Sequence, residues 1–226
     1  AAWLDAIRAF FTAAAMRAGE WGKSFLPAGV PERVPLPEGS LLVDYVAGGG
    51  GFGDPIDRDP QLVLTDFGRG WVSREIAERI YGVVISRDGR AADAAATNAS
   101  RSEIRQVRKR ESAPVSGKTS GVPSSASDGW QTLLRFHAAM EISASGKQRV
   151  IRCTRCGHLL CDAKENYKLY ALHRSRHLSD IMPPLPTGEP YIGEYHEYFC
   201  PGCATQLQVD MFSPTLGGDS ILWDTR

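Results

Sequence analysis

Cys153-Thr-Arg-Cys156-Gly157 and Cys200-Pro-Gly-Cys203 are the stretches that decide the fold of the second half of this chain. Each C-x-x-C pair can present two thiolates to one metal ion, and four thiolates suit tetrahedral Zn²⁺ with no open coordination position. Gly157 removes the steric cost of a positive φ at the first turn. Each pair ends a β-prone run, RVIRC or HEYFC, so we expect both knuckles at hairpin tips. The sequence therefore predicts a structural zinc site on Cys153, Cys156, Cys200 and Cys203 in a β-rich, zinc-ribbon-like module.

Two other uses of these cysteines stay open. Iron bound by four thiolates would need the same ligands. A redox dithiol would need a C-x-x-C that opens a helix, whereas strand-like runs and prolines surround these pairs. Residues 157–199 form a longer spacer than a common zinc ribbon has, which predicts an insertion there. His158 and Cys161 could substitute as ligands, but they break the paired spacing, and we expect Cys161 to be a small buried hydrophobe.

His173 and His177 stand four residues apart in LYALHRSRHL. This spacing allows two imidazoles on one helix face to chelate a metal ion. No carboxylate motif accompanies them, so we expect the polar face of a helix rather than a second metal site.

The bulk composition excludes few classes of function. The chain has 226 residues, a formal net charge of zero and 42% hydrophobic residues, so it has no overall attraction to nucleic acid or to an anionic membrane. We expect no membrane span, because no apolar run is long enough. The first 21 residues fit an amphipathic helix, and their charges are unlike those of a signal peptide. Cysteines in metal-type spacing favour a reducing compartment, so we expect a cytoplasmic protein.

The chain divides into a module at 1–110, a linker at 111–129 and a module at 130–226. Residues 112–128 are rich in Ser, Gly and Pro, which predicts a flexible linker. In the first module we expect strands at 41–47 and 83–85, a helix begun by Asp59-Pro60, a helix capped by Ser73 and a solvated helix at 93–110. In the second module β-prone runs lie at 132–143, 149–153, 196–200 and 205–212. The predicted fold class is α+β.

Several motifs imitate nucleotide sites. Gly48, Gly50 and Gly53 in AGGGGFGDP satisfy G-x-G-x-x-G. Asp54, however, brings negative charge and Pro55 opposes a helix start, which favours glycines that allow a sharp turn and a close backbone approach. SGKTS at 116–120 ends like a P-loop, yet Ser112 replaces the first glycine and the run lies in the linker.

Charged residues of the first module receive structural interpretations as well. The basic run at 101–110 lacks interleaved aromatics, which favours a solvated helix or a subunit-docking face over nucleic acid binding. We interpret Asp54 and Asp57 as caps or turn residues.

Residues 36–110 resemble the C-terminal end of the hydantoinase B/oxoprolinase family. The resemblance rests on an ordered series of motifs: GGGGFGDP, Arg58-Asp-Pro, Asp66-Phe-Gly-Arg-Gly, Trp71-Val-Ser73 and Tyr81-Gly-Val-Val. That family includes large subunits of enzymes that act on cyclic amides and, in related complexes, on ketones. The part of the family's large chain that would carry catalytic residues is absent, so the resemblance implies no catalytic residue here.

Residues 130–212 look like the gamma subunit of acetone carboxylase-type complexes. The matching runs are Cys153-Thr-Arg-Cys156-Gly157-His158, Glu165-Asn-Tyr167-Lys168 and Glu194-Tyr-His-Glu-Tyr198-Phe-Cys200-Pro-Gly-Cys203. The resemblance implies an accessory zinc-binding subunit of an ATP-dependent ketone carboxylase of the acetone or acetophenone type. It implies larger hydantoinase A-like and hydantoinase B-like partners, which would hold ATP and a further metal.

Two alternative functions stay open at this point. One is a subunit of an ATP-dependent or hydrolytic hydantoinase, oxoprolinase or lactamase complex. The other is a stand-alone zinc-ribbon module that binds nucleic acid or protein.

Overall fold

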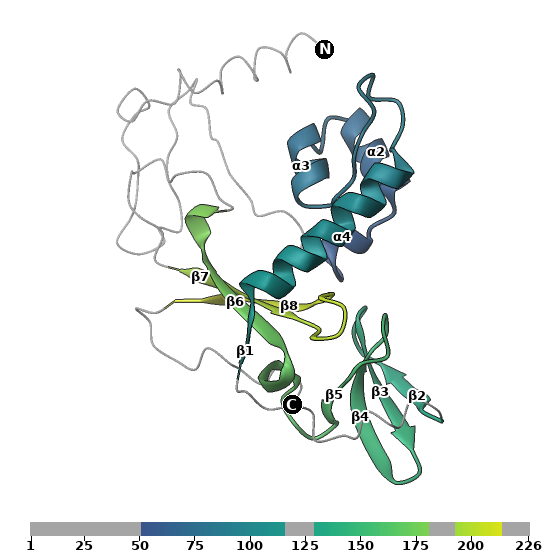
Figure 1. Ribbon diagram of the computed structural model, residues 1–226, viewed down its shortest axis with the longest axis vertical. Coiled ribbons are helices and arrows are strands. Elements are labelled where there is room, and N and C mark those ends of the chain that lie inside the picture. Colours follow the sequence, from purple (N-terminus) through teal and green to yellow (C-terminus); the bar gives the residue numbers. More distant parts are fainter. Residues whose placement is uncertain (1–50, 116–128, 181–192, 214–226) are drawn as a thin grey trace, which may run out of the picture. The chain divides into compact units, whose positions relative to one another are not determined.

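The computed structural model describes residues 51–115, 129–180 and 193–213, and all of them lie in one compact unit of the chain. The helix predicted in the first 21 residues, the strand predicted at 41–47, the run at 116–120 and glycines 48 and 50 lie outside the described residues. What is described combines helices with two antiparallel sheets, so the predicted α+β class is confirmed (Figure 1).

Helices dominate the described residues before the linker (Figure 1). They are a 3-10 helix at Pro55–Asp57, α2 (Pro60–Gly68), α3 (Arg74–Arg79) and α4 (Ala94–Glu111). Side-chain oxygens of Asp59, Ser73 and Asp93 accept hydrogen bonds from backbone N–H groups in the first turns of α2, α3 and α4. Such caps satisfy donors that a helix start leaves free, and the two helix starts predicted at Asp59 and Ser73 are confirmed.

A small apolar cluster holds these helices together. Its buried members are Val63, Ala77, Val83 and Ile85. The strand predicted at 83–85 is wrong in extent, because the described backbone forms only one bridge there, between Ile85 and Ala92. Burying a valine or isoleucine contributes about 1.5–3 kcal/mol, so the described part of this cluster is a modest core. Contacts outside it therefore matter to the stability of residues 51–111.

Two four-stranded antiparallel sheets form the rest of the described structure (Figure 1). One has the order β1-β6-β7-β8: β1 (Ala113–Pro114), β6 (Leu172–His177), β7 (Glu194–Phe199) and β8 (Gln206–Phe212). The other has the order β2-β3-β4-β5: β2 (Gln131–Arg135), β3 (Met140–Ser145), β4 (Gln148–Cys153) and β5 (Leu159–Asp162). Short 3-10 helices lie at Tyr167–Tyr170 and Leu178–Asp180. The β-prone run at 132–143 is two strands of a hairpin.

A shared core joins the two sheets. Buried side chains from both sheets belong to one cluster, including Met140 and Ile151 from one sheet and Tyr198 and Leu207 from the other. Cys153 and Cys200 belong to the same cluster. The apolar core therefore leads directly to the two knuckles.

The predicted helix around His173 and His177 is wrong. Both residues lie in β6, whose residues pair in register with β7 from Leu172↔Phe199 to His177↔Glu194. The tertiary pairing overrides the four-residue spacing, because a strand places alternate side chains on opposite faces. The His173 ring packs 4.9 Å from the His196 ring, and burial together with His196 lowers the pKa of His173. Among the described residues, the grouped metal-ligating side chains are the four paired cysteines and not these histidines.

A buried ion pair connects α4 to the turn that precedes α2. Arg108 donates to both carboxylate oxygens of Asp54, at 2.7 and 3.0 Å. Both residues are buried, so the expectation of a fully solvated helix at 93–110 is wrong for this face. Asp54 caps the 3-10 helix as expected, and it also accepts a hydrogen bond from the backbone N–H of Gln206 at 2.9 Å. Charge patterning predicts exposure, but a buried carboxylate makes burial of Arg108 favourable.

We predict that Asp54→Ala destabilises the chain strongly, by about 3–5 kcal/mol, because it leaves the Arg108 guanidinium buried without its partner. Urea unfolding of the full chain measures the change in the free energy of unfolding. Asp59→Ala is the matched control, since it removes an exposed helix cap and is expected to cost about 1 kcal/mol. Equal effects of the two substitutions would contradict the structural role of the buried pair.

Candidate metal centre

The two C-x-x-C motifs lie in the connections between paired strands, as predicted. Cys153 is the last residue of β4, and Cys156 lies in the connection to β5. Cys200 directly follows β7, and Cys203 lies in the connection to β8. Each motif thus sits at the tip of an antiparallel hairpin, where a short connection fixes the directions of both thiols.

The two knuckles have the same backbone hydrogen bonds. In the first, Cys153 N–H donates to His158 O at 2.9 Å, and Gly157 N–H donates to Cys153 O at 2.9 Å. In the second, the corresponding donors and acceptors are Cys200 to Thr205 at 2.9 Å and Ala204 to Cys200 at 2.8 Å. These bonds close both turns in the same way, so each presents its two cysteines to the same side.

The residue after each second cysteine has a positive φ. Gly157 has a φ of 73°, which confirms the expected role of this glycine, and Ala204 has a φ of 55°. A residue with a Cβ pays roughly 1–2 kcal/mol in the left-handed region. Nothing in the sequence marks Ala204 as the partner of Gly157, and only the equivalent backbone of the two knuckles shows it.

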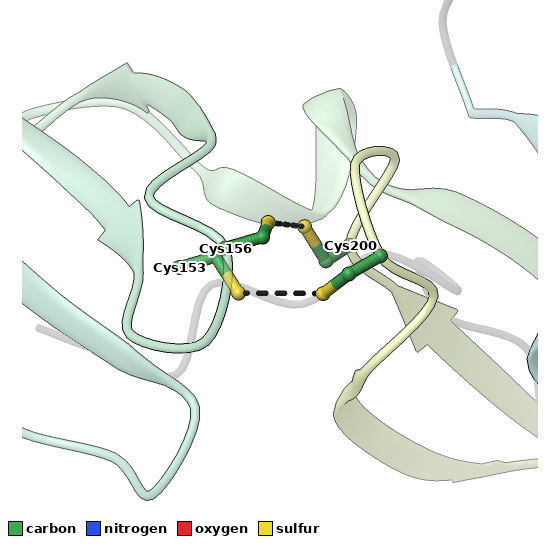
Figure 2. Close-up of side chains that lie close together, drawn as sticks. Cys153, Cys156 and Cys200 are labelled. Carbon is green, nitrogen blue, oxygen red and sulfur yellow. Dashed lines mark hydrogen bonds between the residues drawn. The ribbon is translucent and has the colours of Figure 1, made fainter. Parts of the chain in front are cut away.

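Four sulfur atoms converge between the knuckles (Figure 2). Cys153 Sγ lies 3.8 Å from Cys203 Sγ, and Cys156 Sγ lies 3.7 Å from Cys200 Sγ. All four sulfurs lie within 4.8 Å of one another. A tetrahedron with metal–sulfur bonds of about 2.3 Å has edges of about 3.8 Å, whereas a disulfide bond is about 2.05 Å long. The four cysteines are free thiols, and their spacing is that of a four-coordinate metal site.

The thiols influence one another's protonation. Hydrogen bonds with Cys153 and Cys200 lower the pKa of Cys156 to about 7. The hydrogen bond with Cys156 raises the pKa of Cys153, and the hydrogen bond with Cys153 raises the pKa of Cys200. Negative charges so close together repel, so the cluster cannot become four thiolates without a cation. A divalent ion supplies that cation and converts the four thiols into ligands.

Close packing of the two knuckles depends on Gly202. A Cβ added at Gly202 would lie 2.9 Å from Cys156 Sγ and 3.1 Å from His158 Cβ. Burial lowers the pKa of His158, which keeps this imidazole neutral beside the cluster. His158 contributes packing at this position, and the described cluster of potential ligands does not include it.

The fifth cysteine is separate from the cluster. Cys161 lies in β5, is 1% exposed and belongs to the apolar core. Burial raises the pKa of its thiol to about 12, with further contributions from Glu165 and Asp162. The prediction of a small buried hydrophobe is confirmed.

Sequence reasoning missed a basic face of α4 that touches the knuckles. Arg105 donates to Thr205 Oγ at 3.1 Å, Arg108 to Ala204 O at 3.1 Å, and Lys109 to Gly202 O at 2.7 Å. The signal was present, because residues 101, 105 and 108 fall at the spacing of one helix face. Their partners are distant in the sequence, so only the fold identifies them.

Comparison with known proteins agrees with the knuckle geometry. Residues 130–217 match the acetone carboxylase gamma subunit family. The chain is 46% identical to the acetone carboxylase alpha subunit of Xanthobacter autotrophicus over 79 residues, which are 34% of this chain and 10% of that protein. It is 38% identical to the gamma subunit of the same organism over 72 residues, 30% of this chain and 42% of that protein.

The beta subunit of the caprolactamase of Pseudomonas jessenii is 44% identical over 63 residues, 28% of this chain and 11% of that protein. The chain thus spans less than half the length of each of these relatives. All three relatives are named as subunits, which supports a subunit role, and the suspected combination of hydantoinase B-like and gamma-like parts is confirmed. None of the described helices has the length and apolar character needed to cross a membrane.

We predict that Cys200→Ser lowers the metal content of the purified chain and its thermal stability, because a structural metal site contributes its binding energy to folding. Elemental analysis and thermal unfolding of the same sample measure both effects. Cys161→Ala is the matched control, since this buried cysteine lies outside the cluster and should leave the metal content unchanged. Full metal content in Cys200→Ser would contradict the four-cysteine site.

We also predict that Cys161 resists alkylation in the folded protein between pH 7 and pH 9. The thiolate is the reactive form, and a thiol with a pKa of about 12 is almost entirely protonated over this range. Iodoacetamide labelling followed by peptide mass spectrometry measures its rate against the urea-unfolded chain. Labelling of Cys161 at the same rate in both states would refute its burial.

Proposed function

We propose that this chain is an accessory zinc-binding subunit of a multi-subunit, ATP-dependent ketone carboxylase of the acetone or acetophenone type, with a structural and assembly role. The match of residues 130–217 to the gamma subunit family carries the proposal. The second support is the additional likeness to an alpha subunit of the same kind of enzyme. A chain that combines both likenesses belongs where the two kinds of subunit meet.

Zinc is the metal that we propose for Cys153, Cys156, Cys200 and Cys203. Four sulfur ligands at tetrahedral spacing leave no position for substrate or water, which is the arrangement of a structural zinc site. The ion would join the two hairpins that carry the knuckles. Iron with four thiolates would use the same ligands, and elemental analysis of the purified chain distinguishes the two metals.

We propose that larger hydantoinase A-like and hydantoinase B-like subunits cover the apolar surface of residues 51–71. Phe52, Leu62 and Trp71 are 83%, 54% and 71% exposed. Phe52 and Leu62 line an open pocket of about 420 Å³ that also includes Tyr81 and Ala138. Large apolar side chains in such positions favour association with another protein. ATP, a further metal ion and the catalytic groups would then belong to the partner subunits of a cytoplasmic complex.

A second candidate function is that of a subunit in a hydantoinase or lactamase complex. Likeness to the caprolactamase beta subunit and to a putative D-/L-hydantoinase of Pseudomonas, in its B subunit, favours this function. Purifying the tagged chain with its co-expressed partners separates the two candidates. Incorporation of labelled bicarbonate into a ketone with ATP supports the carboxylase, whereas ring opening of a cyclic amide without bicarbonate supports the alternative. A stable monomer that captures no large subunit would favour a stand-alone zinc-ribbon module instead.

We predict that Trp71→Ala weakens assembly with the larger subunits by about 2 kcal/mol or more, because buried tryptophans are frequent interface hot spots. The free energy of unfolding of the isolated chain should change by less than about 0.5 kcal/mol, since the side chain is exposed there. Affinity measurements and urea unfolding test the two parts. Arg79→Ala, on the exposed surface of α3, is the control, and equal affinity of the two variants would contradict this docking face.

A further inference from the structure

The segment that contains α4 holds the second knuckle through successive contacts. Lys109 Nζ donates to Gly202 O at 2.7 Å, and Arg108 Nη1 donates to Ala204 O at 3.1 Å. Arg105 Nη1 donates to Thr205 Oγ at 3.1 Å, and the N–H of Gln206 donates to Asp54 at 2.9 Å. The residues on both sides of Cys203 are therefore fixed by residues 54–109.

The first knuckle is connected to the same segment. Arg155, which lies between Cys153 and Cys156, forms an ion pair with Asp57. Asp57 also accepts from Arg105 Nη2 at 2.7 Å. One carboxylate thus links a residue of the first knuckle to the arginine that contacts the second. The position of each knuckle relative to the other depends on this shared network.

The network reaches a cluster sulfur through one hydroxyl group. Thr205 Oγ lies 3.2 Å from Cys203 Sγ, within the range of a hydrogen bond to sulfur. With metal bound, the Cys203 sulfur is a thiolate and has no proton to donate. The Thr205 hydroxyl can then donate to this sulfur while it accepts from Arg105. The result is a continuous path from the Arg105 guanidinium through the Thr205 hydroxyl to the Cys203 thiolate.

The charges around the cluster favour the same state. Arg105, Arg108, Lys109 and Arg155 contact the two knuckles, and Asp54 and Asp57 are the carboxylates that pair with them. The cations outnumber these carboxylates, so the surroundings carry net positive charge. Four thiolates around a divalent ion carry net negative charge. Partners that hydrogen-bond and orient metal ligands commonly strengthen metal binding.

We propose that metal binding by the four cysteines and docking of residues 51–111 on the knuckles are thermodynamically coupled, with Arg105 and Thr205 as positioning residues for the Cys203 thiolate. This inference rests on the metal site of the proposed function. Coupling between two binding events is reciprocal, so docking slows loss of the metal, and the metal holds the docked segment in place. A partner that grips residues 51–111 would thereby also stabilise the metal centre.

Zinc release from the full chain tests the first direction of this coupling. The zinc-loaded protein is mixed with an excess of a chromogenic chelator, and the release rate is measured. Thr205→Val removes the hydroxyl and nearly keeps the volume, so release should accelerate about tenfold or more, and Arg105→Gln should accelerate it as well. Thr205→Ser keeps the hydroxyl and should restore the wild-type rate. Arg110→Gln is the matched control, because Arg110 pairs with Glu103 at 3.9 Å on an exposed part of α4.

A cobalt-substituted sample separates positioning from general stability. Sulfur-to-cobalt charge-transfer bands report the hydrogen bonding of the thiolates, so they should shift in Thr205→Val and return in Thr205→Ser. Hydrogen exchange tests the reverse direction of the coupling. Removing the metal should accelerate exchange in the C-terminal turns of α4, while the amides of Val83 and Ile85 in the helical core serve as the reference for global unfolding.

The outcomes distinguish this inference from the metal proposal. A chain that binds no metal overturns both. Zinc bound normally, with equal release rates in Thr205→Val, Thr205→Ser and Arg110→Gln, overturns the coupling and leaves the metal site standing. Exchange in α4 that is the same with and without metal, or that rises only together with exchange of Val83 and Ile85, also overturns the coupling.

Discussion

The buried carboxylate of Asp54 is the constraint on which the arrangement of the described segments depends. It accepts hydrogen bonds from Arg108 in α4, from Ile56 in its own turn and from Gln206 at the start of β8. Its side chain is fully buried, so each of these donors replaces water that the charge has lost. A buried pair of this kind adds little net stability compared with apolar packing, but it allows one arrangement of its partners. Here that arrangement brings α4 against the knuckle that contains Cys203.

Glycines make this arrangement sterically possible at two places. Gly53 has a φ of 80°, and a Cβ there would lie 2.9 Å from Ala138 Cβ. Gly202 allows the second knuckle to approach Cys156. The glycine stretch that imitates a dinucleotide fingerprint thus contains at least one glycine required for a turn and a close approach. The negative charge after it, on Asp54, binds arginine.

Sequence alone predicted the features that depend on local patterns. Short spacing identified the paired cysteines, capping residues gave the starts of α2 and α3, and β-prone runs gave β4, β7 and β8. The features that it missed depend on pairing between distant residues. His173 lies in a strand because β7 pairs with it, and Arg108 is buried because Asp54 lies 54 residues earlier. Neither partner can be found from the spacing within one segment.

Placing both kinds of segment on one chain changes the strength that their contact needs. The relatives in Xanthobacter autotrophicus are named as separate alpha and gamma subunits, whereas residues 36–110 and 130–217 here are parts of one polypeptide. A short connection gives two linked surfaces an effective concentration in the millimolar range. A few ion pairs and hydrogen bonds between α4 and the knuckles can then keep the segments docked without a large apolar interface. The exposed apolar side chains at 52, 62 and 71 are consequently free to contact a third surface, which is what an assembly subunit requires.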